Sequence, residues 1–159
     1  MQLLRARDAV MQRFRPHLRK QGLTDQQGRI LRTLAETERL EMSELAARTS
    51  IHPASLSRII PGLERKGIVR RWKNDADARR VAVSITKRGL AVVQPVMRQS
   101  KRIYAQLAAQ MGPGHWRELH RCLEMLIKTS GKTVAATGNI PSRRTRRVNG
   151  AAAPGSPMP

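Results

Sequence analysis

The stretch that decides the fold is residues 42–80, which read MSELAARTSIHPASLSRIIPGLERKGIVRRWKNDADARR. Ser43 is a good N-cap for a short helix with an apolar face. The polar run at residues 48–52 interrupts that helix, and Pro53 suits the first position of a second one. The second helix runs up to Gly67, which supplies a left-handed C-terminal cap. Two short helices joined by a tight polar turn predict a helix-turn-helix.

The second of these helices presents two contrasting faces. One face is apolar at helical spacing and consists of Leu56, Ile59, Ile60 and Leu63. The other is small, hydroxylic and basic and consists of Ala54, Ser55, Ser57, Arg58, Pro61 and Arg65. Small side chains let a helix sit deep in a major groove, where serine can bond bases or phosphates and arginine prefers guanine. Any solvated surface helix can carry such a face, so this observation alone leaves both interpretations open.

A β-hairpin is predicted directly after the second helix. Residues 68–73 read as a strand, residues 74–78 as a polar turn and residues 81–85 as an alternating strand. A hairpin in this position is a wing, and its flanks carry five cations: Arg70, Arg71, Lys73, Arg79 and Arg80. Cations so placed suit a phosphate backbone or a narrow minor groove. The alternative, a charged hairpin that is merely exposed, is weakened by the basic helix face beside it.

Taken together, these features resemble the MarR-type winged-helix regulators. The segments that carry the resemblance occur in the family order and are residues 43–46, 53–58, 63–69, 77–80 and 83–86. Residues 77–86 are similar to the family's wing signature, an aspartate-x-arginine before a strand that ends in leucine-threonine. Three N-terminal segments narrow the resemblance to the homoprotocatechuate and nicotinate degradation repressors; they are residues 4–11, 14–16 and 23–27. The resemblance covers roughly residues 1–130.

This resemblance implies a homodimeric regulator of double-stranded DNA, usually a repressor that a small ligand releases from a pseudo-palindromic operator. For a member of this branch the ligand would be a hydroxyphenylacetate- or hydroxynicotinate-like aromatic acid, and the controlled genes an aromatic-catabolism operon. By resemblance, Asp77 orients the wing and Arg79 enters the minor groove. The candidate DNA contacts are Ser43, His52, Ala54, Ser55, Ser57, Arg58, Arg65, Arg70, Lys73, Arg79 and Arg80.

Further helices are predicted before the helix-turn-helix. Residues 2–20 read as one helix, which Pro16 is expected to kink or to end early. A capping box of Thr24 and Gln27 opens another, which runs to about Ala35.

Two long helices are predicted after the wing. Thr86 caps the first, which runs to about Gln110, and a firm break at residues 111–114 precedes the second. These apolar-striped helices exceed what the small winged domain can bury, so with the first helix they predict a two-fold dimer module. The expected fold is mainly α, a winged helix-turn-helix with a two-stranded β wing plus N- and C-terminal dimerisation helices. The expected division is 1–22 (dimerisation helix), 23–86 (DNA-binding domain), 87–130 (dimerisation helices) and 131–159 (disordered basic tail).

An effector site is predicted beside the first helix, because the pocket implied by the resemblance lies between the dimer module and the winged domain. An aromatic acid needs a cation or imidazole, apolar walls and room. Arg15 and His17 could supply the charge, Met11 and Phe14 the walls and Gly28 the room. Relatives of this branch tend to carry tryptophan where Gly28 stands, so either neighbouring side chains or a ligand could fill that space. For each of these residues, interface packing or surface charge is the alternative reading.

The composition favours a polyanionic partner. The 159 residues include 31 Lys and Arg but 11 Asp and Glu, for a net charge of +20. Residues 131–159 contribute five of these cations and no acid, so most of the charge lies on the folded part. No apolar run approaches the roughly 20 residues of a membrane span, and no signal-peptide core is present, which suggests a cytoplasmic protein.

Catalytic and metal chemistry have little support in the sequence. The four histidines are scattered, no nucleophile motif surrounds the serines, and no cofactor or metal is expected. Cys122 is the only cysteine and fits a reducing compartment. It is expected to be a buried apolar thiol in the last helix rather than a peroxide sensor. The main alternative to a ligand-controlled regulator is an architectural or weakly specific DNA-binding protein without a ligand, and a protein-interaction module is a more distant one.

Overall fold

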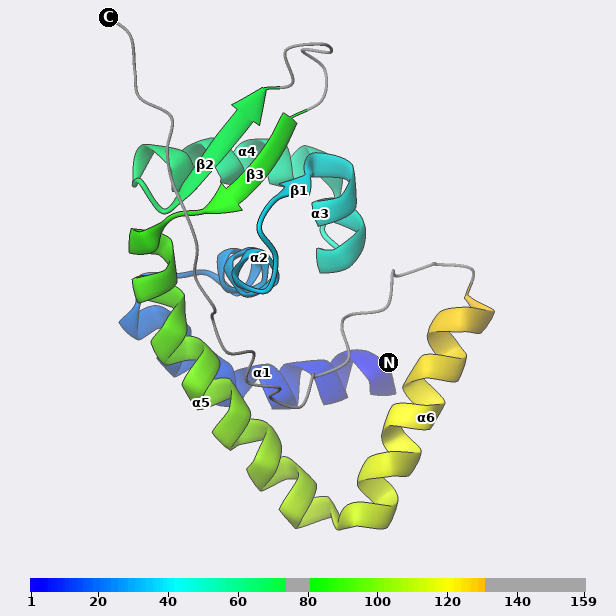
Figure 1. Cartoon of the computed structure of the whole chain (residues 1–159). Coiled ribbons are helices and arrows are strands. Elements are labelled where there is room, and N and C mark those ends of the chain that lie inside the picture. The colour runs from blue at the N-terminus through cyan, green and yellow to red at the C-terminus, as the bar shows by residue number, and fades with distance from the viewer. Residues whose placement is uncertain (74–80, 131–159) are drawn as a thin grey trace, which may run out of the picture.

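The computed structural model describes residues 1–73 and 81–130 (Figure 1). The chain is mainly helical with one small sheet, as the sequence predicted. Its elements are α1 (Gln2–Lys20), α2 (Asp25–Ala35), β1 (Leu40–Glu41), α3 (Met42–Thr49), α4 (Pro53–Arg65), β2 (Val69–Lys73), β3 (Val81–Ile85), α5 (Lys87–Met111) and α6 (Pro113–Thr129). The predicted turn at 74–78 and the predicted disordered tail at 131–159 lie outside the described residues.

The sheet has three antiparallel strands in the order β1-β3-β2, so the expectation of a two-stranded wing missed one strand. β1 pairs Leu40 with Val83, and β2 pairs with β3 from Val69↔Ile85 to Lys73↔Val81. β1 has only two residues, too few to show any alternation in the sequence. It forms because the free edge of β3 offers backbone partners.

The core lies beneath the sheet and is organised around α2, which contacts α1, α3, α5 and β3. Figure 1 shows α2 end-on, between the winged part and α1. Its inward residues Ile30, Leu31 and Leu34 are fully buried, as predicted. α5 approaches the end of the winged part at Gly89, where a Cβ would collide with the carbonyl oxygen of Ile68. Only glycine permits this close packing of helix against chain.

Most predicted helix ends are confirmed. The capping box of Thr24 and Gln27 is present, and Thr86 caps α5 by accepting from the Gly89 N–H at 3.0 Å. Gly67 has φ +66°, the left-handed conformation expected after α4. The prediction for Ser43 was wrong, because α3 begins one residue earlier with Glu41 at the N-cap and Ser43 lies within the first turn.

The first helix is continuous, so the expectation that Pro16 would end it early was wrong. α1 packs on α5 and α2, and this packing holds the chain in helical form beyond the proline. Phe14 of α1 is buried and its ring lies 5.2 Å from that of Tyr104 on α5. These contacts offset the single backbone hydrogen bond that a proline removes from a helix.

The last helix is different from the rest of the fold. α6 contacts α5 but has no buried residue, and Figure 1 shows it standing at an angle to α5, away from the winged part. Its exposed apolar residues are Leu119, Leu123, Met125, Leu126 and Ile127. Leu3 and Leu4 at the start of α1 are also more than half exposed. Among the described residues, no helix is long and apolar enough to span a membrane.

Candidate nucleic-acid interface

The helix-turn-helix consists of α3, a short turn and α4. Ser50 adopts a left-handed conformation with φ 50° and ends α3, and Ile51 turns inward and is buried. His52 is the N-cap of α4, and its Nδ1 accepts from the Ala54 N–H at 3.3 Å. The accepting nitrogen must be unprotonated, so a neutral ring carries its hydrogen on Nε2. His52, predicted as a DNA contact, is thus also fixed at the start of the recognition helix.

The two faces of α4 separate as the sequence predicted. Leu56, Ile60 and Leu63 are buried, and Ile59 is half-buried beside them. Opposite them, Ala54, Ser57, Arg58 and Arg65 are exposed, and Ser55 is half-buried. Among the described residues, neither Arg58 nor Arg65 lies within ion-pair distance of a carboxylate. The face therefore offers hydroxyls and uncompensated positive charge to an anionic partner.

α3 is held in place by charged side chains that the sequence did not single out. Arg29 of α2 donates to the carbonyl oxygen of Thr49, the last residue of α3, at 2.9 Å. Burial and the neighbouring cations Arg7 and Arg32 lower the pKa of Arg29. An arginine on the apolar side of a helix, between Gly28 and Ile30, was the available signal. Arg29 thus ties the helix-turn-helix to the central helix of the core.

The wing is tied to the recognition helix by one of its own predicted cations. Arg71 of β2 donates from Nε to Oε2 of Glu64 at 2.6 Å, and its backbone N–H donates to Oε1 at 3.1 Å. Desolvation raises the pKa of Glu64, but the hydrogen bonds from Arg71 outweigh it, so the pKa lies below the usual value. The charge of Arg71 is therefore largely neutralised inside the domain, unlike that of its neighbour Arg70.

The outward face of the sheet carries a feature that sequence reasoning missed. The guanidinium groups of Arg39 and Arg70 lie over the ring of Trp72, at 4.3 and 4.1 Å from its centroid. Of the predicted wing contacts, Arg70 is exposed. Asp77, Arg79 and Arg80 lie outside the described residues, and so does the side chain of Lys73.

Comparison with known proteins agrees with this architecture. The model of the MarR family matches residues 23–81. The homoprotocatechuate degradative operon repressor of Escherichia coli is 38% identical over 125 residues, which are 79% of this chain and 84% of that protein. The chain belongs to the MarR family. It is accordingly a winged-helix, DNA-binding transcriptional regulator and not an enzyme.

Solved structures of other MarR-family regulators extend the comparison. The structure of NadR in complex with 4-hydroxyphenylacetate has 35% identity and a TM-score of 0.69, covering 79% of this chain and 89% of NadR. The M. tuberculosis transcriptional regulator MOSR in complex with DNA has 28% identity and a TM-score of 0.69, covering 81% of this chain and 92% of that one. The likeness thus extends well beyond the winged domain.

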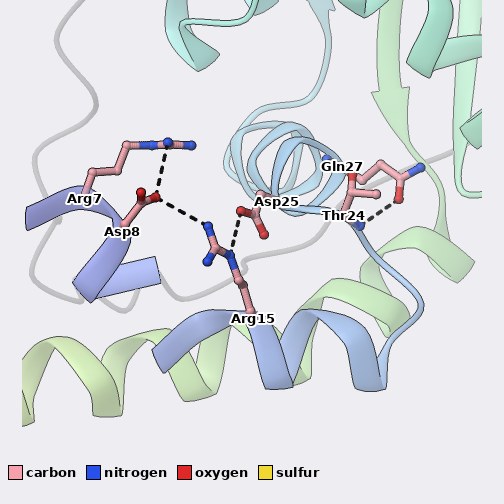
Figure 2. A network of polar contacts seen from close by, with 6 residues as sticks. All are labelled: Arg7, Asp8, Arg15, Thr24, Asp25 and Gln27. Carbon is pink, nitrogen blue, oxygen red and sulfur yellow. Dashed lines mark hydrogen bonds and ion pairs between the residues drawn. The ribbon is translucent and has the colours of Figure 1, made fainter. Parts of the chain in front are cut away.

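The predicted effector residues lie on α1 and α2, but their charges and space are already engaged. Figure 2 shows Arg15 of α1 between Asp25, at 3.4 Å, and Asp8, at 3.5 Å. A Cβ on Gly28 would collide with Cδ2 of Leu18, so the room that Gly28 leaves is filled by Leu18. Phe14 is buried, and Met11 and His17 are half-buried. Of the alternatives for the missing tryptophan, repacking by a neighbour is the one observed in this MarR-family chain.

Cys122 corrects another expectation, because it is exposed on α6 rather than buried. Its thiol donates to Oε1 of Glu118 at 3.4 Å. This hydrogen bond, with desolvation, raises the pKa of Cys122. A raised pKa leaves less of the reactive thiolate, so the geometry does not favour a sensor cysteine. Arg121 and Cys122 in turn lower the pKa of Glu118 to about 2.

Proposed function

We propose that the protein is a homodimeric repressor of an aromatic-catabolism operon, released from its operator by a small aromatic acid. The observation that carries the proposal is the acid-free, hydroxylic and basic face of α4 in a chain that is 38% identical to an operon repressor. The homoprotocatechuate repressor and NadR with 4-hydroxyphenylacetate are named for aromatic acids, which suggests this class of effector.

In the proposed complex, each α4 enters a major groove and each wing lies along the flanking backbone. Arg58 would read a base edge, since it is exposed at the middle of the outward face, and Ser55 and Ser57 would bond bases or phosphates beside it. Ser43, Ala54 and Arg65 would lie along the groove walls. Residues 23–86 form the DNA-binding unit in this proposal.

The two half-sites are read together only if the protein is a dimer. We assign the interface to residues 1–20 and roughly 100–130, because the exposed leucines of α6 and of the start of α1 lie there. Exposed apolar surface of this kind marks a contact with another chain. A second copy places two recognition helices at a fixed separation, and the operator half-sites then lie about 34 Å apart.

The effector would act through the α1–α2 contact. An aromatic acid entering there must displace Leu18 from Gly28 and must compete with Asp8 and Asp25 for Arg15. Both changes would shift α2, which Arg29 ties to the end of α3. The ligand therefore favours a dimer whose recognition helices no longer match the half-sites, which is the differential binding that release requires.

The test is a footprint on the DNA upstream of the protein's own gene, followed by titration with hydroxyphenylacetates and hydroxynicotinates. A protected pseudo-palindrome is expected, and one of these acids should weaken binding about 5–150-fold. Linkage requires operator DNA to weaken binding of that acid by the same factor, which calorimetry measures. If an acid binds but DNA leaves its affinity unchanged, the site exists and the switch does not.

A ligand-independent DNA-binding protein is the second candidate. The ion pairs of Arg15 and the packing of Leu18 against Gly28 favour it, because they occupy the proposed effector site. The two candidates separate on the affinity for operator relative to random duplex at one stated salt concentration. A ratio near one, together with no response to a broad panel of aromatic acids, would establish the second.

A further inference from the structure

The outward face of the sheet holds a cation–aromatic cluster made of Arg39, Arg70, Trp72 and Ser84. Arg70 and Trp72 are two residues apart on β2 and share one face. Trp72 Nε1 donates to Oγ of Ser84 at 2.9 Å, and Ser84 is the β3 partner of Arg70. The indole therefore lies across the neighbouring strand, with both guanidinium groups over its ring.

The side chains of the cluster are fixed by this packing. A guanidinium over an indole gains roughly 0.5–1 kcal/mol at an exposed site, and here the ring is also held by a hydrogen bond. Arg39 comes from the segment before β1, so it reaches Trp72 only because the third strand is present. Two long, exposed side chains thus lose freedom on folding that they would otherwise lose on binding a partner.

The two charges of the cluster are not compensated. Several other arginines of this chain lie within ion-pair distance of acids: Arg15 of Asp8 and Asp25, Arg48 of Glu44, Arg71 of Glu64. Among the described residues, neither Arg39 nor Arg70 is within ion-pair distance of a carboxylate. Glu41 shares the face through its pairing with Ala82, so the cluster still bears an excess of positive charge.

We propose that Arg39 and Arg70, held by Trp72, bind a phosphate of the DNA backbone outside the base pairs read by α4. Trp72 is a positioning residue in this proposal. It lies nearer than Arg70 to the end of β2 that leads into the wing turn, so stacking draws the Arg70 guanidinium toward that end of the wing. The inference rests on the proposed approach of the wing to duplex DNA.

The duplex backbone fits this cluster better than an acidic protein surface does. Two fixed cations close to one ring match the spacing of negative charge along a duplex, about one per 1.7 Å of its axis. The same chain carries a net charge of +20 and belongs to a DNA-binding family. An acidic protein partner is the alternative outcome of the test.

The experiment measures operator affinity against salt concentration for two duplexes, the operator core and the same core with about ten extra base pairs on each side. The variants are Arg39→Ala, Arg70→Ala, Trp72→Leu and Trp72→Phe in the full chain. Arg98→Ala on α5 is the control, because it removes an exposed charge far along the chain from the sheet. Thermal unfolding of each variant checks that the fold is intact.

Wild type is expected to bind the longer duplex more tightly, and each arginine variant should lose that gain. The slope of log affinity against log salt should fall by about 1.8 per arginine, which is 0.9 for each of the two protomers. Trp72→Leu should lower the slope, Trp72→Phe should restore most of it, and Arg98→Ala should leave the flank gain unchanged. In the Arg39→Ala/Arg70→Ala background, Trp72→Leu should have no further effect, because Trp72 acts through these two side chains.

Unchanged slopes and an unchanged flank gain in the arginine variants overturn the proposal and direct attention to an acidic protein partner. A loss in Trp72→Leu that persists without the two arginines also overturns it, since the role of Trp72 would then be structural. If Trp72→Leu fails to fold, the exposed Arg39 and Arg70 variants still decide the phosphate contact. Wild type that binds no duplex overturns this inference and the proposed function together; a wild type that binds while all variants match it overturns only the inference.

Discussion

The winged part and α6 bury their apolar residues to very different degrees. Leu45, Leu56, Leu63 and Val83 of the winged part are fully buried within one chain. α6 has a comparable apolar stripe, yet none of its residues is buried. The comparison shows that the winged part folds around its own core, whereas α6 lacks a partner in this chain. The two regions should therefore respond to the same kind of substitution in different ways.

The largest effect is expected from breaking the proposed dimer. Leu123→Glu together with Leu126→Glu places two charges in the exposed stripe of α6. The protein should become monomeric in sedimentation at micromolar concentration. Operator affinity should fall roughly 10²–10⁴-fold, because binding at the second half-site ceases to be intramolecular.

The control for this experiment is Lys128→Glu on the same helix. Lys128 follows the apolar residues and is itself polar and exposed, so an added acid there should leave the dimer intact. A double leucine variant that still sediments as a dimer would place the interface elsewhere. A wild-type protein that sediments as a stable monomer would contradict the dimer proposal directly.

A second prediction makes the same chemical change in both regions. Leu63→Ala leaves a cavity in the core of the winged part and should lower the free energy of unfolding by about 2–5 kcal/mol at any protein concentration. Leu126→Ala removes the same atoms from an exposed position. Its effect on thermal unfolding should depend on protein concentration, because the contact it weakens lies between chains. Equal, concentration-independent losses would mean that α6 packs within its own chain.

A third prediction concerns the outer surface of the winged part. Arg58→Ala should cost roughly 1–3 kcal/mol of operator binding and relax specificity at one base position. Arg79→Ala should weaken binding to all duplexes and lower the salt slope by about 0.9 per lost phosphate contact. Binding titrations on operator and random duplex at two salt concentrations measure both. If Arg79→Ala leaves affinity unchanged at both, the role of the wing derived from the family resemblance is wrong.

The sequence predicted best where a signal is local. Pro53 and Gly67 mark the ends of α4, and Thr24 with Gln27 marks the start of α2, because each acts on backbone groups within four residues. Ser43 misled because a good capping residue is not necessarily used. Glu41 takes the N-cap instead, where β1 ends and its backbone is extended.

Features that depend on how elements meet were not predictable in this way. The pairing of Arg15 with Asp25 and the filling of Gly28 by Leu18 both follow from how α1 crosses α2. The spacing of Arg70 and Trp72 could have been recognised as one face of a strand. The arrival of Arg39 at the same ring depends on β1, for which the sequence had no signal.

The smallest predicted effect concerns the tie between wing and recognition helix. Glu64→Gln removes the ion pair with Arg71 and should lower the free energy of unfolding by less than about 1 kcal/mol, since the pair is partly exposed. The pKa of Glu64 is lowered in the folded protein, so its stabilisation is present above the ordinary value of 4.5 and is lost as the pH falls through the lowered pKa. The difference between wild type and Glu64→Gln should therefore be constant near neutral pH and vanish in acid. Denaturant unfolding of both proteins across this range measures it. A difference that persists at low pH would show that the carboxylate charge is not what ties β2 to α4.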